Sequence, residues 1–99
     1  MTSKNDDNNI IVSTELTIIN KLGLHARAAS KLAQLCQKFS AKITLFLEDK
    51  EADANSIMAI MLLAGGQGKR VKVTAQGVDA PAALSAISKL ISDKFDENE

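Results

Sequence analysis

The chain has 99 residues, of which 45% are hydrophobic, so it is long enough for one packed domain and too short for two. Its 12 basic and 12 acidic residues cancel, which leaves no broad electrostatic attraction to nucleic acid or to an anionic membrane surface. The single cysteine excludes an internal disulfide and no apolar run reaches the roughly 18 residues of a membrane span, so we expect a soluble, cytoplasmic protein.

The pattern of polar and apolar residues indicates one domain with two short polar ends. Residues 1–9 predict a disordered extension, residues 10–96 the domain, and residues 97–99 an acidic tail. Within the domain, alternating β-branched residues predict a strand over 10–20. A helix is predicted from about 26 to 39, because apolar residues recur there at helical spacing. These residues are Ala29, Leu32, Ala33, Cys36 and Phe39.

Three more strands and two more helices follow in the predicted order. Alternation predicts strands over 41–48, 51–54 and 70–76. The second helix, from 56 to 64, is expected to end at Gly65 and Gly66, and Asp79 is expected to cap the third. The order β-α-β-β-α-β-α predicts an α+β fold, with one four-stranded, mostly antiparallel sheet and the helices on one face.

His25, the only histidine, lies in the run GLHARAA (23–29), where the strand pattern gives way to the helix pattern. This places it at or beside the N-cap, where free backbone N–H groups and about half a positive charge favour an anion such as phosphate. A neutral imidazole there would present a nucleophilic nitrogen to that anion, and Arg27 could bind two of its oxygens. A histidine at a helix start is equally explained as a cap or a partly buried polar group, and the residues alone leave both interpretations open.

Other kinds of site are disfavoured by spacing or by residue count. Cys36 lies 11 residues beyond His25, about 16 Å along a helix axis, so the two cannot form a catalytic pair. One histidine and one cysteine are too few for a zinc site, and we predict no metal or other cofactor. The glycine-rich run 65–70 precedes a strand and lacks P-loop spacing, which indicates a tight connection.

The second helix has almost no polar face, unlike a typical surface helix. We expect Ile57, Met58 and Met61 to remain partly exposed as a docking patch, because methionine adapts to different partners. The alternative is that the whole helix is buried. Ser56 is the predicted N-cap of this helix. We favour that role over regulatory phosphorylation, which would add a charge of about −2 beside the patch and impede docking.

Two motifs together resemble a known family. GLHARAA at 23–29 and NSIMAIM at 55–61 are similar to motifs of HPr, the histidine-containing phosphocarrier protein of the bacterial phosphoenolpyruvate-dependent phosphotransferase system. The resemblance covers about residues 12–95, and two motifs in the matching order of elements make it specific. It implies an open-faced β-sandwich with four antiparallel strands and three helices.

The resemblance also implies a role for each motif residue. The histidine matching His25 accepts a phosphoryl group on Nδ1 from Enzyme I and passes it to a IIA-type protein. The arginine matching Arg27 assists, and backbone N–H groups around Ala26 and Arg27 help to hold the phosphate. The serine matching Ser56 is the target of an HPr kinase/phosphorylase in some members, and the apolar residues after it dock partners. We expect a monomer.

One position departs from the family pattern. Many members have proline where this chain has Ala28, so the first helical turn keeps an N–H and loses the fixed φ of proline. We expect a slightly less rigid helix start, with an effect on transfer rate more than on function. The run from 56 to 68 is also similar to proteobacterial forms and to the nitrogen-related branch called NPr, which leaves the branch open.

The resulting hypothesis is a stoichiometric phosphocarrier, not an enzyme, in which His25 relays a phosphoryl group between two larger proteins. Two alternatives stay open. One is a regulatory binding module that uses the surface of Ile57, Met58 and Met61, and the other is an unrelated small α+β interaction domain. The presence of both His25 and Arg27 favours the carrier, since a purely regulatory protein could lose the nucleophile.

Overall fold

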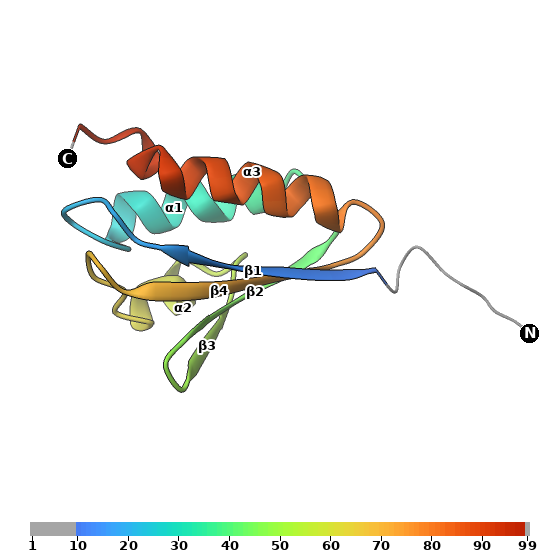
Figure 1. Ribbon diagram of the computed structural model, residues 1–99, viewed down its shortest axis with the longest axis horizontal. Helices are drawn as coiled ribbons and strands as arrows, with labels where there is room; N and C mark the ends of the chain where they lie inside the picture. Colours follow the sequence, from blue (N-terminus) through green and yellow to red (C-terminus); the bar gives the residue numbers. More distant parts are fainter. Residues whose placement is uncertain (1–9, 99) are drawn as a thin grey trace, which may run out of the picture.

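The computed structural model describes residues 10–98 and consists of helices layered on one sheet (Figure 1). Strands and helices follow one another in the predicted order, with a short 3₁₀ turn added after the last helix. The elements are β1 (Ile11–Thr17), α1 (Ala26–Cys36), β2 (Lys42–Leu47), β3 (Lys50–Asp53), α2 (Ile57–Leu62), β4 (Arg70–Gln76), α3 (Ala80–Ser92) and η2 (Lys94–Asp96). The extension predicted over 1–9 lies outside the described residues.

The four strands form one antiparallel sheet in the order β1-β4-β2-β3. β4 has a neighbour on each side, with Val71 opposite Leu16 of β1 and Val73 opposite Leu45 of β2. Residues directly opposite each other in an antiparallel pair share a face of the sheet, so these side chains lie together on the face toward the helices. The predicted antiparallel sheet is confirmed.

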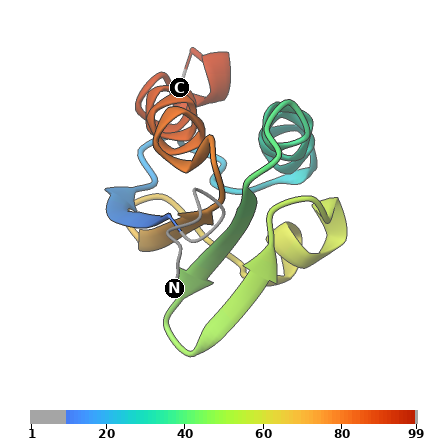
Figure 2. The same ribbon diagram turned by 90° about the vertical axis from the view of Figure 1, so that its right-hand side faces the viewer.

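All three helices cover the same face of the sheet, as Figure 2 shows. α3 packs on β1 and β4, α1 packs beside α3, and α2 lies between α1 and β3. Among the described residues, no helix covers the opposite face. The α+β open-faced β-sandwich expected from the sequence is therefore confirmed. No helix within residues 10–98 has the length and apolar character needed to cross a membrane.

The core lies between the sheet and the helices and follows directly from the sequence alternation. In β2, Ile43, Leu45 and Leu47 are buried while the residues between them face outward. Burying each such side chain stabilises the fold by about 1.5–3 kcal/mol. The helices complete the core with Ala29, Leu32, Ala33 and Cys36 from α1, Ile60 from α2, and Ala83, Ile87 and Ile91 from α3.

The structure shortens several of the predicted elements, β1 and α1 among them. β1 ends at Thr17 and not near residue 20, and α1 ends at Cys36 and not at residue 39. At the end of α1, the N–H groups of Lys38 and Phe39 donate to carbonyls three residues back, which tightens the chain and ends the α-helix. Phe39 is therefore half-buried at the edge of the core instead of continuing the helical stripe.

The end of α2 differs from the predicted glycine cap. The residue that turns the chain in the left-handed region is Ala64, with φ 56°, and not Gly65. Gly65 is needed for close packing, because a Cβ there would lie 2.7 Å from Cδ1 of Ile18 and 2.8 Å from Cδ1 of Leu24. The sequence-based prediction was thus wrong about the cap, since the glycine serves a contact between segments distant in the chain.

Asp79 occupies the N-cap position of α3, but its side chain does not cap the helix. Its carboxylate instead accepts the backbone N–H groups of Ser40, at 2.9 Å, and Ala41, at 2.8 Å. These hydrogen bonds, that of Ser40 foremost, lower the pKa of Asp79 below its usual value. The prediction of a local cap was wrong, because the side chain fastens the start of β2 to the start of α3.

Cys36 provides a test of the packing of α1. The thiol is buried, and this burial, with a smaller contribution from the carboxylate of Asp53, raises the pKa of Cys36 to about 12. Because the thiolate is the reactive form, we predict that the native protein does not react with the thiol reagent DTNB at mildly alkaline pH, whereas the urea-unfolded chain reacts quickly. A rapid reaction of the native protein would contradict the packing.

A second test concerns Gly23, which has φ 67° and whose Cβ, if present, would overlap the carbonyl oxygen of Gly65. We predict that Gly23→Ala lowers the free energy of unfolding by about 2 kcal/mol or more. The alanine would be strained in this left-handed conformation, and its Cβ would also clash with the backbone of Gly65. Gly66→Ala is the matched control, since a Cβ at Gly66 has no atom within 4 Å. Equal urea midpoints for the two variants would show that the close approach is not required.

Candidate functional site

His25 is the N-cap residue of α1, as predicted. Its backbone is extended, with φ −73° and ψ 178°, and its carbonyl accepts the N–H of Ala29 at 2.8 Å in the first helical hydrogen bond. The turn before it depends on left-handed Gly23 and on the N–H of Leu24, which donates to the carbonyl of Gly65 at 2.9 Å. This backbone contact fixes where α1 begins and therefore where the imidazole lies.

The two ring nitrogens of His25 have different partners. The backbone N–H of Arg27 points at Nδ1 at 3.3 Å, so Nδ1 is the nitrogen that carries a lone pair. In the neutral ring the proton then resides on Nε2, which donates to the carboxylate of Glu97. Nδ1 thus faces the positive end of α1, where both Ala26 and Arg27 are exposed. The structure brings together the three residues expected at this site.

Glu97 is the site residue that the sequence analysis missed, since it assigned residues 97–99 to a tail. Its side chain is only 11% exposed and also accepts a hydrogen bond from Nδ2 of Asn20 at 3.1 Å. Burial by itself would raise the pKa of Glu97, but hydrogen bonds from His25 and Asn20, with the nearby charge of Arg27, lower it below its ordinary value of 4.5. No local pattern connects two residues 72 positions apart.

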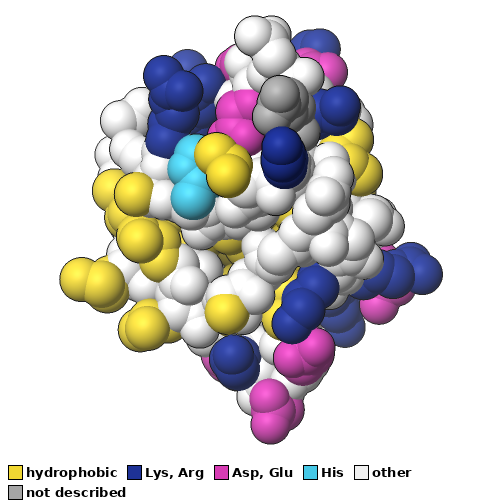
Figure 3. Space-filling view, turned by 90° about the vertical axis from the view of Figure 1, so that its left-hand side faces the viewer, with side chains coloured by type: hydrophobic (Ala, Val, Ile, Leu, Met, Phe, Trp, Pro, Cys, Tyr) yellow, Lys and Arg dark blue, Asp and Glu magenta, His cyan; other side chains and the backbone are white. Residues whose placement is uncertain are grey.

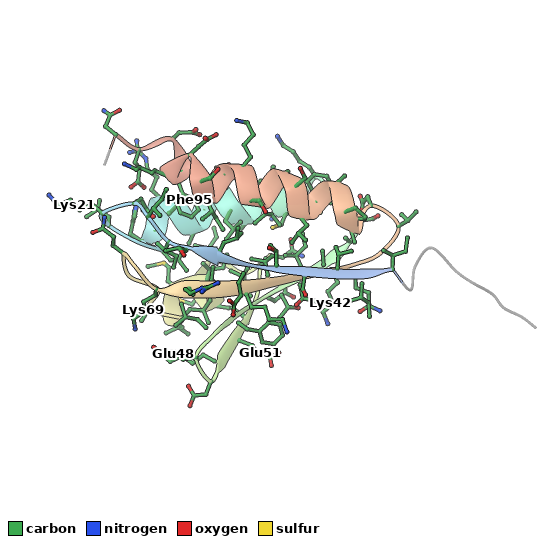
Figure 4. All side chains as sticks on the ribbon, viewed as in Figure 1. Lys21, Lys42, Glu48, Glu51, Lys69 and Phe95 are labelled. Carbon is green, nitrogen blue, oxygen red and sulfur yellow. The ribbon has the colours of Figure 1, made fainter. Side chains whose placement is uncertain are left out.

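The chain reaches the imidazole through a left-handed turn in η2. Lys94, Phe95 and Asp96 have φ values of 58°, 55° and 64°, a conformation that costs about 1–2 kcal/mol for each residue with a side chain. Phe95 is fully buried where the end of α3 meets α1 (Figure 4), and burial of a phenylalanine offsets about 1.5–3 kcal/mol of that cost. Lys31 of α1 adds a hydrogen bond from Nζ to the Phe95 carbonyl at 2.7 Å.

The imidazole lies between two open hollows on the surface. The first is polar and is lined by Leu22, His25, Arg27, Asp96, Glu97 and Asn98. The second is more apolar and extends from His25 past Leu24 and Gly65 to Met61 of α2. Figure 3 shows the histidine in the upper part of this face, with basic and acidic side chains above it and hydrophobic side chains beside and below it. The ring is therefore open to a partner that also contacts α2.

Exposed hydrophobic side chains gather on α2 beside the histidine. Met58 is 69% exposed, whereas Ile60 is buried, so the helix has one buried side and one exposed side. The alternative of a fully buried helix was wrong. The exposed side, here called the α2 patch, consists of Ile57, Met58, Met61 and Leu62. Ser56 caps the helix, because its Oγ accepts the N–H of Ala59 at 3.1 Å, and this predicted cap is confirmed.

Comparison with known proteins identifies the family. Residues 12–93 match the family model described as PTS HPr component phosphorylation site. The chain belongs to the PTS HPr family. It is 49% identical to the phosphocarrier protein NPr of Shewanella violacea over 83 aligned residues. The alignment covers 84% of this chain and 91% of that protein. It is 46% identical to the phosphocarrier protein HPr of Xylella fastidiosa over 84 aligned residues. The alignment covers 85% of this chain and 94% of that protein.

Solved structures agree with this assignment. The crystal structure of HPr-C-His from Thermoanaerobacter tengcongensis matches with a TM-score of 0.85 and 41% identity, over 89% of this chain and 99% of that chain. HPr from Bacillus anthracis matches with a TM-score of 0.80 and 36% identity, over 84% of this chain and 99% of that chain. The resemblance to the HPr/NPr phosphocarriers of the phosphotransferase system is confirmed, and an accidental motif match is excluded.

The departure at Ala28 falls inside the site. Ala28 lies in the first turn of α1 and is fully buried. Its methyl group therefore contributes to the core in the turn that directly follows His25. The effect of this alanine on the rate of transfer stays a prediction.

The contact between Glu97 and His25 predicts a pH dependence of stability. The pKa of Glu97 is lowered in the folded protein and takes its ordinary value of 4.5 in the unfolded chain. Its contribution to the free energy of unfolding is therefore fully present above pH 4.5 and is lost as the pH falls through the lowered pKa. We expect the difference in free energy of unfolding between wild type and Glu97→Gln, measured by urea unfolding, to become smaller as the pH falls through this range. If the difference between the two proteins did not change with pH, the lowered pKa of Glu97 would be refuted.

Proposed function

We propose that this protein accepts a phosphoryl group from phospho-Enzyme I on Nδ1 of His25 and passes it to IIA-type proteins of the phosphotransferase system. The observation that supports this most directly is the position of Nδ1. It carries a lone pair, faces the positive end of α1 and lies on an open surface beside Arg27. Membership of the HPr family supports the choice of partner classes.

The local geometry suits reversible transfer. The Nδ1 lone pair forms a bond to phosphorus while the bond from phosphorus to the donor atom breaks and leaves its electron pair on the donor. The incoming oxygens would replace Nδ1 as acceptors of the Arg27 N–H, next to the N–H of Ala26. The guanidinium of Arg27 can bind two oxygens and balance their charge. Transfer to a IIA-type protein follows by the same step in reverse.

The α2 patch is proposed as part of the docking surface for both partners. It borders the second hollow beside His25, so a protein that covers the patch also covers the imidazole. Ser56 lies at the start of this helix, where its cap is sufficient to explain it. A phosphate on Ser56 by an HPr kinase/phosphorylase is the alternative, and it would place negative charge against the patch.

The function is tested by intact-mass measurement after incubation with Enzyme I, Mg²⁺ and phosphoenolpyruvate. We predict one acid-labile phosphate on wild type, none on His25→Ala and one on Ser56→Ala, which controls for the second candidate site. Absence of the adduct on wild type in the presence of active Enzyme I would overturn the carrier function. The α2 patch would then favour a regulatory binding module.

Docking has its own prediction. At low concentrations of this protein, Met58→Asp should slow its phosphorylation by Enzyme I about tenfold, because the aspartate would bury a charge in the interface. This factor corresponds to about 1.4 kcal/mol of lost binding free energy. Val78→Asp is the matched control, since Val78 is also an exposed hydrophobic residue but lies in the loop before α3, at the opposite end of the molecule (Figure 1). Equal rates for the two variants would remove the α2 patch from the interface.

A further inference from the structure

The described residues contain three sulfur atoms, which differ in their exposure. The thiol of Cys36 lies in the core, and this residue is only 2% exposed. Met58 and Met61 belong to the α2 patch, and they are 69% and 40% exposed. Both thioether side chains are therefore open to small molecules in solution, whereas the thiol is not.

Peroxides distinguish between these two kinds of sulfur. A thiol reacts as its thiolate, so burial of Cys36, which raises the pKa of this thiol to about 12, protects it at neutral pH. A thioether has no proton to lose before it reacts, so its exposure decides how readily it is oxidised. An oxidant that meets this protein therefore reacts with the α2 patch before it reacts with the core.

The two methionines also lie where a change of polarity affects the site. Met61 lines the second hollow together with His25. Met58 precedes Met61 by three residues on α2, and side chains at this spacing are neighbours on a helix surface. A protein that covers the imidazole from this side also covers both side chains. Oxidation there alters the docking surface and leaves the groups proposed to bind phosphate in place.

We infer that Met58 and Met61 are sites of reversible oxidation to methionine sulfoxide by hydrogen peroxide, and that this modification weakens docking of the proteins that give and take the phosphoryl group. The inference rests on the proposed function. It adds to that function a regulation of the same surface by an oxidant.

The modification transfers one oxygen atom to each sulfur. A lone pair of the thioether forms the sulfur–oxygen bond while the oxygen–oxygen bond of the peroxide breaks. The departing oxygen keeps the electron pair of that bond and takes the proton of the transferred oxygen, so it leaves as water. The sulfur is oxidised and the peroxide is reduced. A thiol-dependent reductase reverses the change, because it returns the electrons and releases the oxygen as water.

The sulfoxide affects binding more than folding. In the free protein its oxygen is hydrated, because both side chains are at the surface. In a complex the water is removed, and an apolar partner surface offers no donor to the oxygen. Oxidation therefore lowers the free energy of docking and leaves the free energy of unfolding unchanged.

The test is to treat the protein with hydrogen peroxide, remove the peroxide with catalase and measure phosphorylation by Enzyme I. Peptide masses should show oxygen on Met58 before Met61, and DTNB should still titrate Cys36 after unfolding. At low concentrations of this protein, we expect phosphorylation of the oxidised wild type to be about tenfold slower. The loss should raise KM and leave kcat unchanged, because the chemistry at His25 is not altered.

The matched control is a double variant that carries Met58→Leu and Met61→Leu. It keeps an apolar patch but retains only Met1 and Cys36 as oxidisable sulfurs. Each protein is compared with its own untreated sample, so any effect of the substitutions themselves cancels. Peroxide should not change the rate of the double variant, and methionine sulfoxide reductase should restore the rate of the oxidised wild type.

Equal rates for oxidised and untreated wild type, with both sulfoxides present, would overturn the inference and leave the carrier function intact. Methionines that resist peroxide, equal slowing in the double variant, or a urea midpoint that falls on oxidation would also overturn it. Failure of untreated wild type to accept phosphate from active Enzyme I would overturn the proposed function instead. The two failures are therefore distinguishable.

Discussion

The site depends on the close approach of two backbone segments, the turn before α1 and the loop after α2. The N–H of Leu24 reaches the carbonyl of Gly65 at 2.9 Å, and neither Gly23 nor Gly65 has room for a Cβ. This contact sets the position of His25, the N-cap residue of α1, relative to the exposed end of α2. The same contact therefore places the imidazole beside the α2 patch.

One local interaction and one between distant parts of the chain act on His25. The helix N-terminus supplies backbone N–H groups and partial positive charge at Nδ1, an effect confined to the first turn. The carboxylate of Glu97 supplies an acceptor at Nε2 from the far end of the chain. An isolated helix would provide only the first of these, and it would leave the imidazole free to rotate. The folded domain gives each nitrogen a distinct environment.

The C-terminal segment is held in a strained conformation by its packing. The left-handed turn over η2 is unfavourable by itself, and burial of Phe95 and the Lys31 hydrogen bond offset it. An α3 that ended in the usual way would have avoided the strain, but it would not have turned the chain back over α1. The position of Glu97 is thus a property of packing at the junction of α1 and α3.

The sequence by itself determined the order of elements, the alternating core of β2 and β4, the N-cap positions of His25 and Ser56 and the exposed side chains of Met58 and Met61. These features follow from period, capping and local composition, which act between residues close in the chain. Only the tertiary structure decided that Asp79 binds Ser40 and Ala41, that Gly65 packs instead of capping, and that Glu97 meets His25. Each of these is a contact between distant segments, and no local pattern encodes which partner a side chain will reach once the helices pack on the sheet.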